Sequence, residues 1–158
     1  CQQIKDMHAQ YSDDCLYAIA GRLMTIRSHG KTVFCTLHDA TGSMQIYLKH
    51  DVIGEEQQKF FNDFIDTGDI VWCQGTLFVT KVGELTLKVQ KITLLSKCLH
   101  PLPEKFHGIA DIEIKYRQRY LDLITSTETR DRFYKRTQVI KLLRGYLDQR
   151  GYEEVETP

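Results

Sequence analysis

One stretch of alternating residues, KTVFCTLHDATGSMQIYLK at residues 31–49, constrains the fold more than any other part of the chain. Two runs of period-two alternation flank the turn-forming segment DATGS, which is typical of a β-hairpin. Apolar residues share one side of both predicted strands: Val33, Cys35, Leu37, Met44, Ile46 and Leu48. The hairpin is therefore predicted to have one buried face and one face open to solvent.

The other face of this hairpin carries aromatic rings among polar groups, including Phe34, Gln45 and Tyr47. An aromatic ring on the solvent side of a sheet offers a flat surface on which a nucleobase can stack. The alternative is that a neighbouring loop covers Phe34. Alternation alone slightly favours this alternative.

The elements around the hairpin follow the order strand, strand, strand, helix, strand, strand. Strands are predicted over residues 16–27, 31–38, 44–49, 70–80 and 84–96, with a helix over 55–64. This is the order of the oligonucleotide-binding (OB) fold, a five-stranded Greek-key barrel whose strand 2 and 3 surface receives single-stranded nucleic acid. The order places Phe34 on strand 2 and Gln45 on strand 3, so it favours the stacking interpretation of Phe34.

Two details of the predicted barrel are open to a structural test. Gly21 lies in the middle of the long first strand, where a glycine is typical of a bend or a bulge. Three phenylalanines of the predicted helix, Phe60, Phe61 and Phe64, form an apolar stripe, which we interpret as core packing.

The last third of the chain is helical in pattern. Lys115, Arg117 and Arg119 form a basic cluster that is either a solvated helix face or a contact with nucleic acid or another subunit, and spacing leaves both open. Thr125 and Glu128 have the spacing of a capping box for a long helix that ends near residue 150. The segment YEEVE that follows predicts a strand over residues 152–156.

These patterns divide the chain into four parts. Residues 1–14 are expected to be the end of a helical extension, residues 15–97 the OB barrel, residues 98–110 a proline-containing linker, and residues 111–158 the beginning of a second, truncated domain. Both ends look cut, so we expect a fragment of a longer protein.

The composition narrows the class of protein. Lys and Arg number 21, as do Asp and Glu, so any nucleic-acid site must be local rather than a broad basic surface. The five cysteines are scattered without a Cys-x-x-Cys pair, which argues against a zinc site or a disulfide framework. No apolar run approaches the roughly 20 residues of a membrane span, and there is no signal peptide. We expect a cytoplasmic protein with no metal site and no membrane partner.

Three motifs in the second half resemble one family. HPLPEKFHG at residues 100–108, KYRQRYLDLI at 115–124 and GYEEVETP at 151–158 are similar to bacterial-type class II lysyl-tRNA synthetases. The last resembles motif 1 of class II synthetases, whereas the first two separate lysyl from aspartyl and asparaginyl enzymes. The resemblance extends over residues 17–158.

This resemblance implies roles for individual residues. The family's anticodon-binding positions fall on Arg27, Phe34, Gln45 and Glu84. Phe34 would stack on the central anticodon uridine, Gln45 and Glu84 would contact a base edge, and Arg27 would contact a phosphate or a base carbonyl. Motif 1 builds the family's dimer interface, for which the matching residues here are Phe133, Ile140, Leu143, Leu147 and Pro158.

The resemblance also implies what the parent enzyme does. It would be a homodimer that activates lysine with ATP and Mg²⁺ and transfers it to tRNA(Lys). Motifs 2 and 3, which bind ATP, lysine and magnesium in the family, are not in this sequence, so we expect no catalytic residue and no cofactor in it. His38 and Lys115 depart from the family's usual glutamine and arginine. The alternatives are a non-catalytic OB-fold adaptor that binds nucleic acid and a related aspartyl or asparaginyl synthetase.

Overall fold

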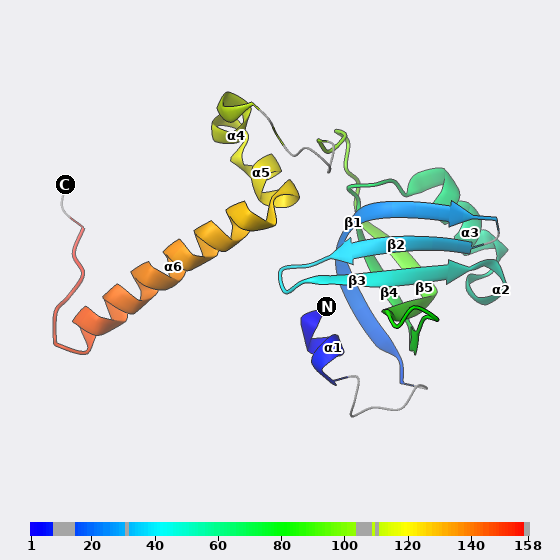
Figure 1. The fold of residues 1–158 in the computed structure, drawn as a ribbon, viewed down its shortest axis with the longest axis horizontal. Coiled ribbons are helices and arrows are strands. Elements are labelled where there is room, and N and C mark those ends of the chain that lie inside the picture. Colours follow the sequence, from blue (N-terminus) through cyan, green and yellow to red (C-terminus); the bar gives the residue numbers. More distant parts are fainter. Residues whose placement is uncertain (8–14, 31, 104–108, 110, 157–158) are drawn as a thin grey trace. The chain divides into compact units, whose positions relative to one another are not determined.

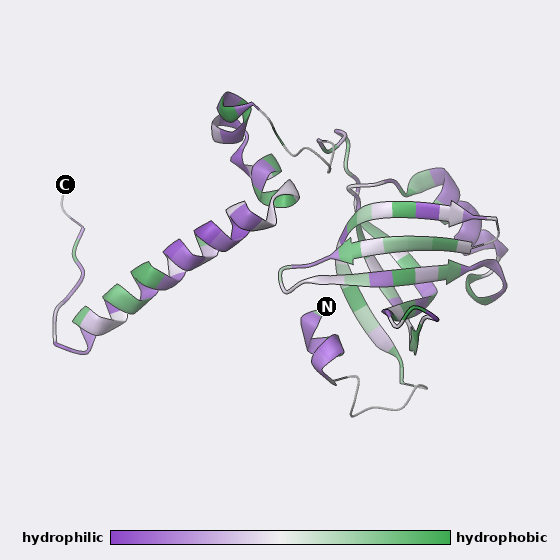
Figure 2. Cartoon of the chain, viewed as in Figure 1, coloured by the Kyte–Doolittle hydropathy of each residue, from purple (hydrophilic) through white to green (hydrophobic). Residues whose placement is uncertain are grey.

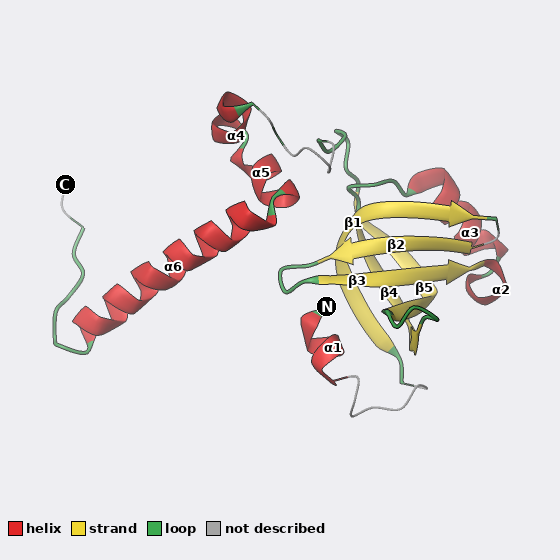
Figure 3. Cartoon of the chain, in the orientation of Figure 1, coloured by secondary structure: helices red, strands yellow, loops and turns green. Residues whose placement is uncertain are grey.

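The structure is a computed structural model that describes residues 1–7, 15–30, 32–103, 109 and 111–156. Two compact units are present, residues 1–101 and residues 102–158, and each is described by itself. In chain order the elements are α1 (Gln2–Met7), β1 (Tyr17–His29), β2 (Thr32–His38), β3 (Ser43–Lys49), α2 (His50–Ile53), α3 (Glu55–Phe64), β4 (Ile70–Val79), β5 (Leu85–Ser96), α4 (Ile112–Arg117), α5 (Arg119–Thr125) and α6 (Thr127–Asp148) (Figures 1 and 3).

The first unit is a closed barrel with the strand order β1-β2-β3-β5-β4. Neighbouring strands are antiparallel except for β3 and β5, which are parallel. The long strand β1 pairs with β4 through its first half and with β2 through its second half, and so joins the two sides of the barrel. This topology confirms the predicted five-stranded OB barrel.

The barrel interior is filled by the apolar side of each strand. The six residues predicted to share the buried face of the hairpin are all at most 3% exposed: Val33, Cys35, Leu37, Met44, Ile46 and Leu48. Burial alternates residue by residue along β2 and β4. Figure 2 shows the hydropathy of each residue along the same strands. Burial raises the pKa of the Cys35 thiol to about 12, although the nearby Arg27 opposes this shift, so Cys35 is a neutral packing residue.

In the structure, Gly21 marks a close approach of two strands and not the predicted bend. The register of β1 against β2 shifts between Leu23 and Thr25, so the irregularity lies after the glycine. Gly21 itself is where two strands approach closely, because a Cβ atom there would lie 2.4 Å from the carbonyl oxygen of His38. Gly75 in β4 is tighter still, at 1.9 Å from the carbonyl oxygen of Lys88.

Helix α3 has the predicted bounds, but its phenylalanine stripe is only partly core. Phe61 is 2% exposed and Phe60 packs against the core, whereas Phe64 is 57% exposed. Phe64 is the last residue of the helix, and its ring contacts that of Phe60 at a centroid distance of 5.6 Å instead of entering the barrel. The interpretation of Phe64 as core was therefore wrong.

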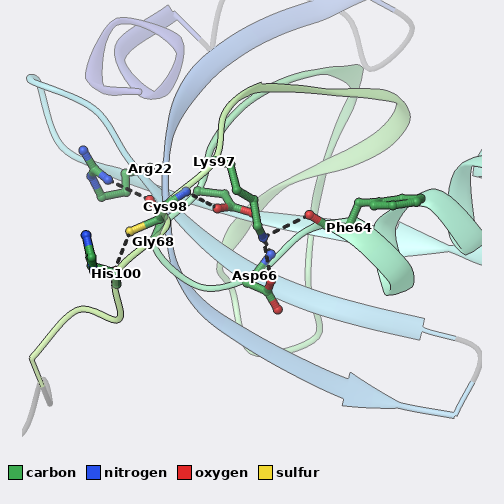
Figure 4. A network of polar contacts seen from close by, with 8 residues as sticks. Arg22, Phe64, Asp66, Gly68, Lys97, Cys98 and His100 are labelled. Carbon is green, nitrogen blue, oxygen red and sulfur yellow. Dashed lines mark hydrogen bonds and ion pairs between the residues drawn. The ribbon is translucent and has the colours of Figure 1, made fainter.

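A network of polar contacts around Lys97 fixes the path of the chain as it leaves the barrel (Figure 4). Asp69, with a fully buried side chain, accepts hydrogen bonds from the backbone amides of Asp66 at 2.8 Å and Cys98 at 2.7 Å and pairs with the Lys97 ammonium at 2.8 Å. Burial alone would raise the pKa of Asp69, but these hydrogen bonds and the ammonium outweigh it and lower the pKa below its ordinary value.

The described residues of the second unit form three helices, α4, α5 and α6. The Asp111 side chain caps α4, and α4 and α5 are separate helices because Gln118 leaves helical geometry between them. The cap of α6 is Ser126, whose hydroxyl accepts from the Thr129 amide at 3.1 Å, and not Thr125 as the capping-box spacing predicted. Part of the predicted linker, residues 104–108 and 110, lies outside the described residues.

The strand predicted over residues 152–156 is not formed, because a strand needs a neighbour to supply hydrogen bonds. The described residues of this unit contain no strand with which this segment could pair. The segment is instead held near α6 by an ion pair of 2.9 Å between Arg144 and Glu154.

Candidate nucleic-acid interface

An open groove of about 570 Å³ lies on the outer surface of the barrel. It contains all four residues that the resemblance assigns to the anticodon. Its lining consists of Arg27, His29, Phe34, Gln45, Tyr47, Phe78, Thr80, Lys81, Val82 and Glu84. Residues that are up to 57 positions apart in the sequence, Arg27 and Glu84, thus border one hollow.

Strand register explains why these side chains meet. Arg27 in β1 is opposite Phe34 in β2, and Phe34 is opposite Tyr47 in β3, so the three form one row across the sheet. Gln45 precedes Tyr47 by two residues in β3 and therefore lies on the same face. Gln45 is paired with Thr86 in β5, which is itself paired with Phe78 in β4, and this gives a second row.

Three aromatic rings form a continuous series in the groove. The ring centroids of Phe34 and Tyr47 are 4.7 Å apart with a tilt of 36°, and those of Tyr47 and Phe78 are 5.6 Å apart with a tilt of 60°. All three side chains are half-buried. Phe34 is thus outside the barrel and borders open space, whereas its sequence neighbours Val33 and Cys35 fill the interior.

Gln45 lies on the outer face as predicted, but it is only 7% exposed. Its Oε1 accepts a hydrogen bond from Arg27 Nη2 at 3.1 Å, and its Nε2 donates to Thr86 Oγ1 at 3.0 Å. Because a guanidinium can only donate, Arg27 determines which end of the amide faces it. One N–H of Gln45 and one lone pair of its oxygen remain for a ligand. The two hydrogen bonds therefore fix the orientation of the Gln45 side-chain amide.

Glu84 is placed by the tight turn between β4 and β5. Thr80 donates its backbone N–H to the Glu84 carbonyl at 3.0 Å, and the Glu84 N–H donates to the Thr80 hydroxyl at 3.0 Å. Gly83 has a φ of +83°, a conformation that favours glycine at this point of a short hairpin loop. The Glu84 side chain is exposed at the rim of the groove.

The charges around the groove differ from those of the whole chain, whose formal net charge is zero. The cations Arg27 and Lys81 border it together with the carboxylate of Glu84. Cationic side chains beside a series of aromatic rings are typical of grooves that bind single-stranded nucleic acid. The arrangement can stack an unpaired base, donate hydrogen bonds to it and accept one from it.

Sequence reasoning assigned no role to Tyr47 or Phe78. The alternating sequence pattern nevertheless marks both residues, because each lies at an outward position of its strand. Phe78 follows the same period as Trp72, Gln74 and Thr76 in β4. What the sequence could not give was the distance between β3 and β4, which are not neighbours in the barrel order.

The residues expected at a dimer interface lie on α6, in the second unit. Phe133 is half-buried, whereas Ile140, Leu143 and Leu147 are 38%, 58% and 39% exposed. The last three border a pocket of about 460 Å³ together with Tyr152 and Glu154. Pro158 lies outside the described residues. The interface role of these residues stays a prediction.

No group of three or more His, Cys, Asp or Glu side chains suited to a metal ion occurs in the described part of the chain. None of the described helices combines the length and apolar character needed to cross a membrane.

The comparisons with known proteins agree with this geometry. Residues 17–95 match the family described as OB-fold nucleic acid binding domain, which covers half of the chain. The chain therefore belongs to the family of OB-fold nucleic acid binding domains. Residues 111–158 match a second family, the class II tRNA synthetases for D, K and N.

The individual relatives distinguish among the class II synthetases for these three amino acids. The chain is 56% identical over 141 residues to the lysine–tRNA ligase of Aquifex aeolicus, which covers 89% of this chain and 24% of the relative. It is 50% identical over 157 residues to the lysine–tRNA ligase of Clostridium acetobutylicum, covering 99% of this chain and 30% of the relative. The resemblance to lysyl-tRNA synthetases is thus confirmed, and the chain spans less than a third of the length of these relatives.

Proposed function

We propose that this chain supplies the anticodon-binding barrel of a lysine–tRNA ligase, and that the groove binds the central anticodon uridine of tRNA(Lys). The observation that supports this most strongly is that Arg27, Phe34, Gln45 and Glu84 border a single groove. Relatives named lysine–tRNA ligase favour this substrate over the aspartate and asparagine alternatives.

Each side chain has a chemical match on uracil. Uracil presents an N3–H donor between two carbonyl acceptors. An ionised carboxylate only accepts and a guanidinium only donates, so Glu84 suits the N–H and Arg27 suits a carbonyl or a phosphate. The free N–H of Gln45 can donate to the other carbonyl, and the ring of Phe34 stacks against the base. Cytosine has no N3–H, so it leaves Glu84 without a donor there.

The stacking role is tested with Phe34→Ala and an RNA anticodon stem-loop that has uridine at its centre. Stacking on an aromatic side chain is worth about 1–3 kcal/mol per base, so affinity should fall by about tenfold or more. Phe64→Ala is the matched control, because it removes an exposed ring of α3 outside the groove. Equal affinity of wild type and Phe34→Ala would contradict the proposal.

The base preference is tested with Glu84→Gln, measured on two stem-loops that differ only in a central uridine or cytidine. A neutral amide can donate as well as accept, so the preference for uridine should shrink by about tenfold while binding to the uridine loop changes less. Glu56→Gln removes an exposed carboxylate in the first turn of α3 and serves as the control. An unchanged preference would refute the role of Glu84, and no preference in wild type would favour a non-specific OB adaptor.

The parent protein would be a cytoplasmic homodimer that activates lysine with ATP and Mg²⁺ and transfers it to tRNA. Apolar residues of α6, namely Phe133, Ile140, Leu143 and Leu147, would contribute to its dimer interface, as would Pro158. No step of lysine activation is assigned to the residues described here. Aminoacylation assays of the full-length protein with lysine, aspartate and asparagine test the choice of amino acid.

A further inference from the structure

The groove has more lining than the uridine contacts use. Its volume of about 570 Å³ lies within the range of roughly 300–1,000 Å³ that is typical of pockets for drug-sized ligands, which are larger than one base. Arg27, Phe34, Gln45 and Glu84 have proposed roles. The remaining lining includes Tyr47, Phe78 and the turn residue Lys81, and none of these three has a proposed role.

The orientation of the rings shows that one base cannot use all of them. Tyr47 is tilted by 36° against Phe34 and by 60° against Phe78. Because these two tilts differ, the rings of Phe34 and Phe78 cannot be parallel. A planar base stacks on a ring only when the two planes are nearly parallel, so a base that lies flat on Phe34 does not lie flat on Phe78.

Phe78 has the surroundings of a second stacking surface. Like Phe34, it is half-buried and borders the open groove, so part of its surface is accessible. It is held in place by the edge contact with Tyr47 at 5.6 Å and by the pairing of Phe78 with Thr86 across β4 and β5. Lys81, three residues later in the chain, also borders the groove and supplies a positive charge.

We propose that Phe78 stacks a second base, the nucleotide adjacent to the uridine on Phe34, and that Lys81 neutralises a phosphate of the same segment. This inference rests on the proposed anticodon function and extends it from one nucleotide to two. Grooves that bind single strands combine cations along the backbone with aromatic rings for successive bases. Tyr47 is the spacer that sets the two stacking rings apart.

The test combines variants of the protein with abasic RNA. Wild type, Phe78→Leu, Phe78→Tyr and Phe34→Leu are titrated with the uridine-centred stem-loop and with two loops that carry an abasic nucleotide on the 5′ or the 3′ side of that uridine. Phe78→Leu keeps apolar volume but removes the ring, whereas Phe78→Tyr retains it. Phe64→Leu is the control for loss of an exposed ring outside the groove. Fluorescence of Trp72, the only tryptophan, verifies that each barrel is folded.

On the intact loop, Phe78→Leu should weaken binding by about tenfold, and Phe78→Tyr should bind like wild type. With one of the two abasic loops, the effect of Phe78→Leu should vanish while that of Phe34→Leu persists. An equal loss on all three loops would show that Phe78 only supports Tyr47 and would overturn the proposal. The proposal would also be overturned if wild type bound both abasic loops as tightly as the intact loop. This outcome is measured on the wild-type protein alone and so does not depend on the folding of any variant.

The two proposals fail in different ways. If Phe34→Leu also binds the intact loop like wild type, the uridine site itself is wrong. If Phe34→Leu weakens binding but Phe78→Leu does not, the uridine site stands and the second base subsite is overturned.

Discussion

The barrel buries its apolar side chains, whereas the helical unit leaves many of its apolar side chains exposed. In residues 1–101, the strands close on themselves and bury a continuous core that includes Leu23, Leu37 and Ile46, each 0% exposed. In residues 102–158, α6 leaves Leu142 72% and Leu143 58% exposed. Helical stability in proteins comes mainly from packing of an apolar face, and the described residues of this unit provide little of it for α6.

The comparison teaches that periodicity predicts an element but not whether that element is covered. In the sequence β2 alternates strictly, and α6 carries apolar residues at three- and four-residue steps, Ile140, Leu143 and Leu147. In β2 the apolar side faces four other strands of the barrel, whereas most of the α6 stripe is open. The relatives are more than three times as long as this chain, which leaves ample protein to cover such a surface in the proposed parent enzyme.

The largest contrast is expected from truncating leucines in the two units. Leu37→Ala should lower the free energy of unfolding of the barrel by about 4 kcal/mol, because it opens a cavity at a site with no exposure. Urea unfolding followed by Trp72 fluorescence measures this, since Trp72 belongs to β4. A change below about 1 kcal/mol would mean that the core is not packed as described.

A glycine pair gives the next largest effect. Gly75→Ala should destabilise the barrel by about 3 kcal/mol, because the new Cβ would collide with the backbone carbonyl of Lys88. Gly145→Ala in α6 is the matched control, since nothing lies within 4 Å of its Cβ position. There the same methyl group should increase helix content, because alanine is the better helix former. Circular dichroism and Trp72 fluorescence separate the two outcomes.

The buried carboxylate at the end of the barrel gives an intermediate effect with a defined pH dependence. Asp69→Asn should cost about 2 kcal/mol at neutral pH, because a neutral amide cannot replace the hydrogen bonds and the ion pair of the carboxylate. Since the pKa of Asp69 is held below its ordinary value of 3.8, its contribution is complete above that pH. The contribution is lost as the pH falls through the lower pKa of the folded state.

Urea unfolding of wild type and Asp69→Asn between pH 2 and pH 7 should therefore show two curves that converge toward acid. Asp66→Asn is the control, because its side chain contacts the same lysine but is 78% exposed. Its curve should stay close to that of wild type. Parallel curves for wild type and Asp69→Asn across the whole range would contradict this role of Asp69.

The smallest effect is expected from truncating an exposed leucine of α6, the counterpart of Leu37 in the barrel. Leu143→Ala should change the stability of the chain by less than about 0.5 kcal/mol, because the side chain is already 58% exposed. Sedimentation at increasing concentration, for wild type and this variant, tests whether the face pairs in this chain. If the variant dissociates a wild-type dimer, α6 is covered by a second copy. A large loss of stability in a monomer would mean that Leu143 is buried in solution.

The sequence was most informative where strict alternation met clear turn residues. Residues 31–49 predicted both the hairpin and its buried face, and the order of elements predicted the barrel. The prediction failed at element ends and at segments without a partner. Phe64 is exposed because it ends its helix, and residues 152–156 form no strand because no described strand of that unit pairs with them.

What the sequence determined by itself is local: which residues alternate, which side of a strand is apolar, and which motifs resemble a known family. Only the tertiary structure placed Gln45 between Arg27 and Thr86, and Phe78 beside Tyr47. The reason is physical. Strand period fixes the face of a side chain, but the distance between side chains on different strands depends on barrel closure and register, which involve contacts between residues far apart in the chain.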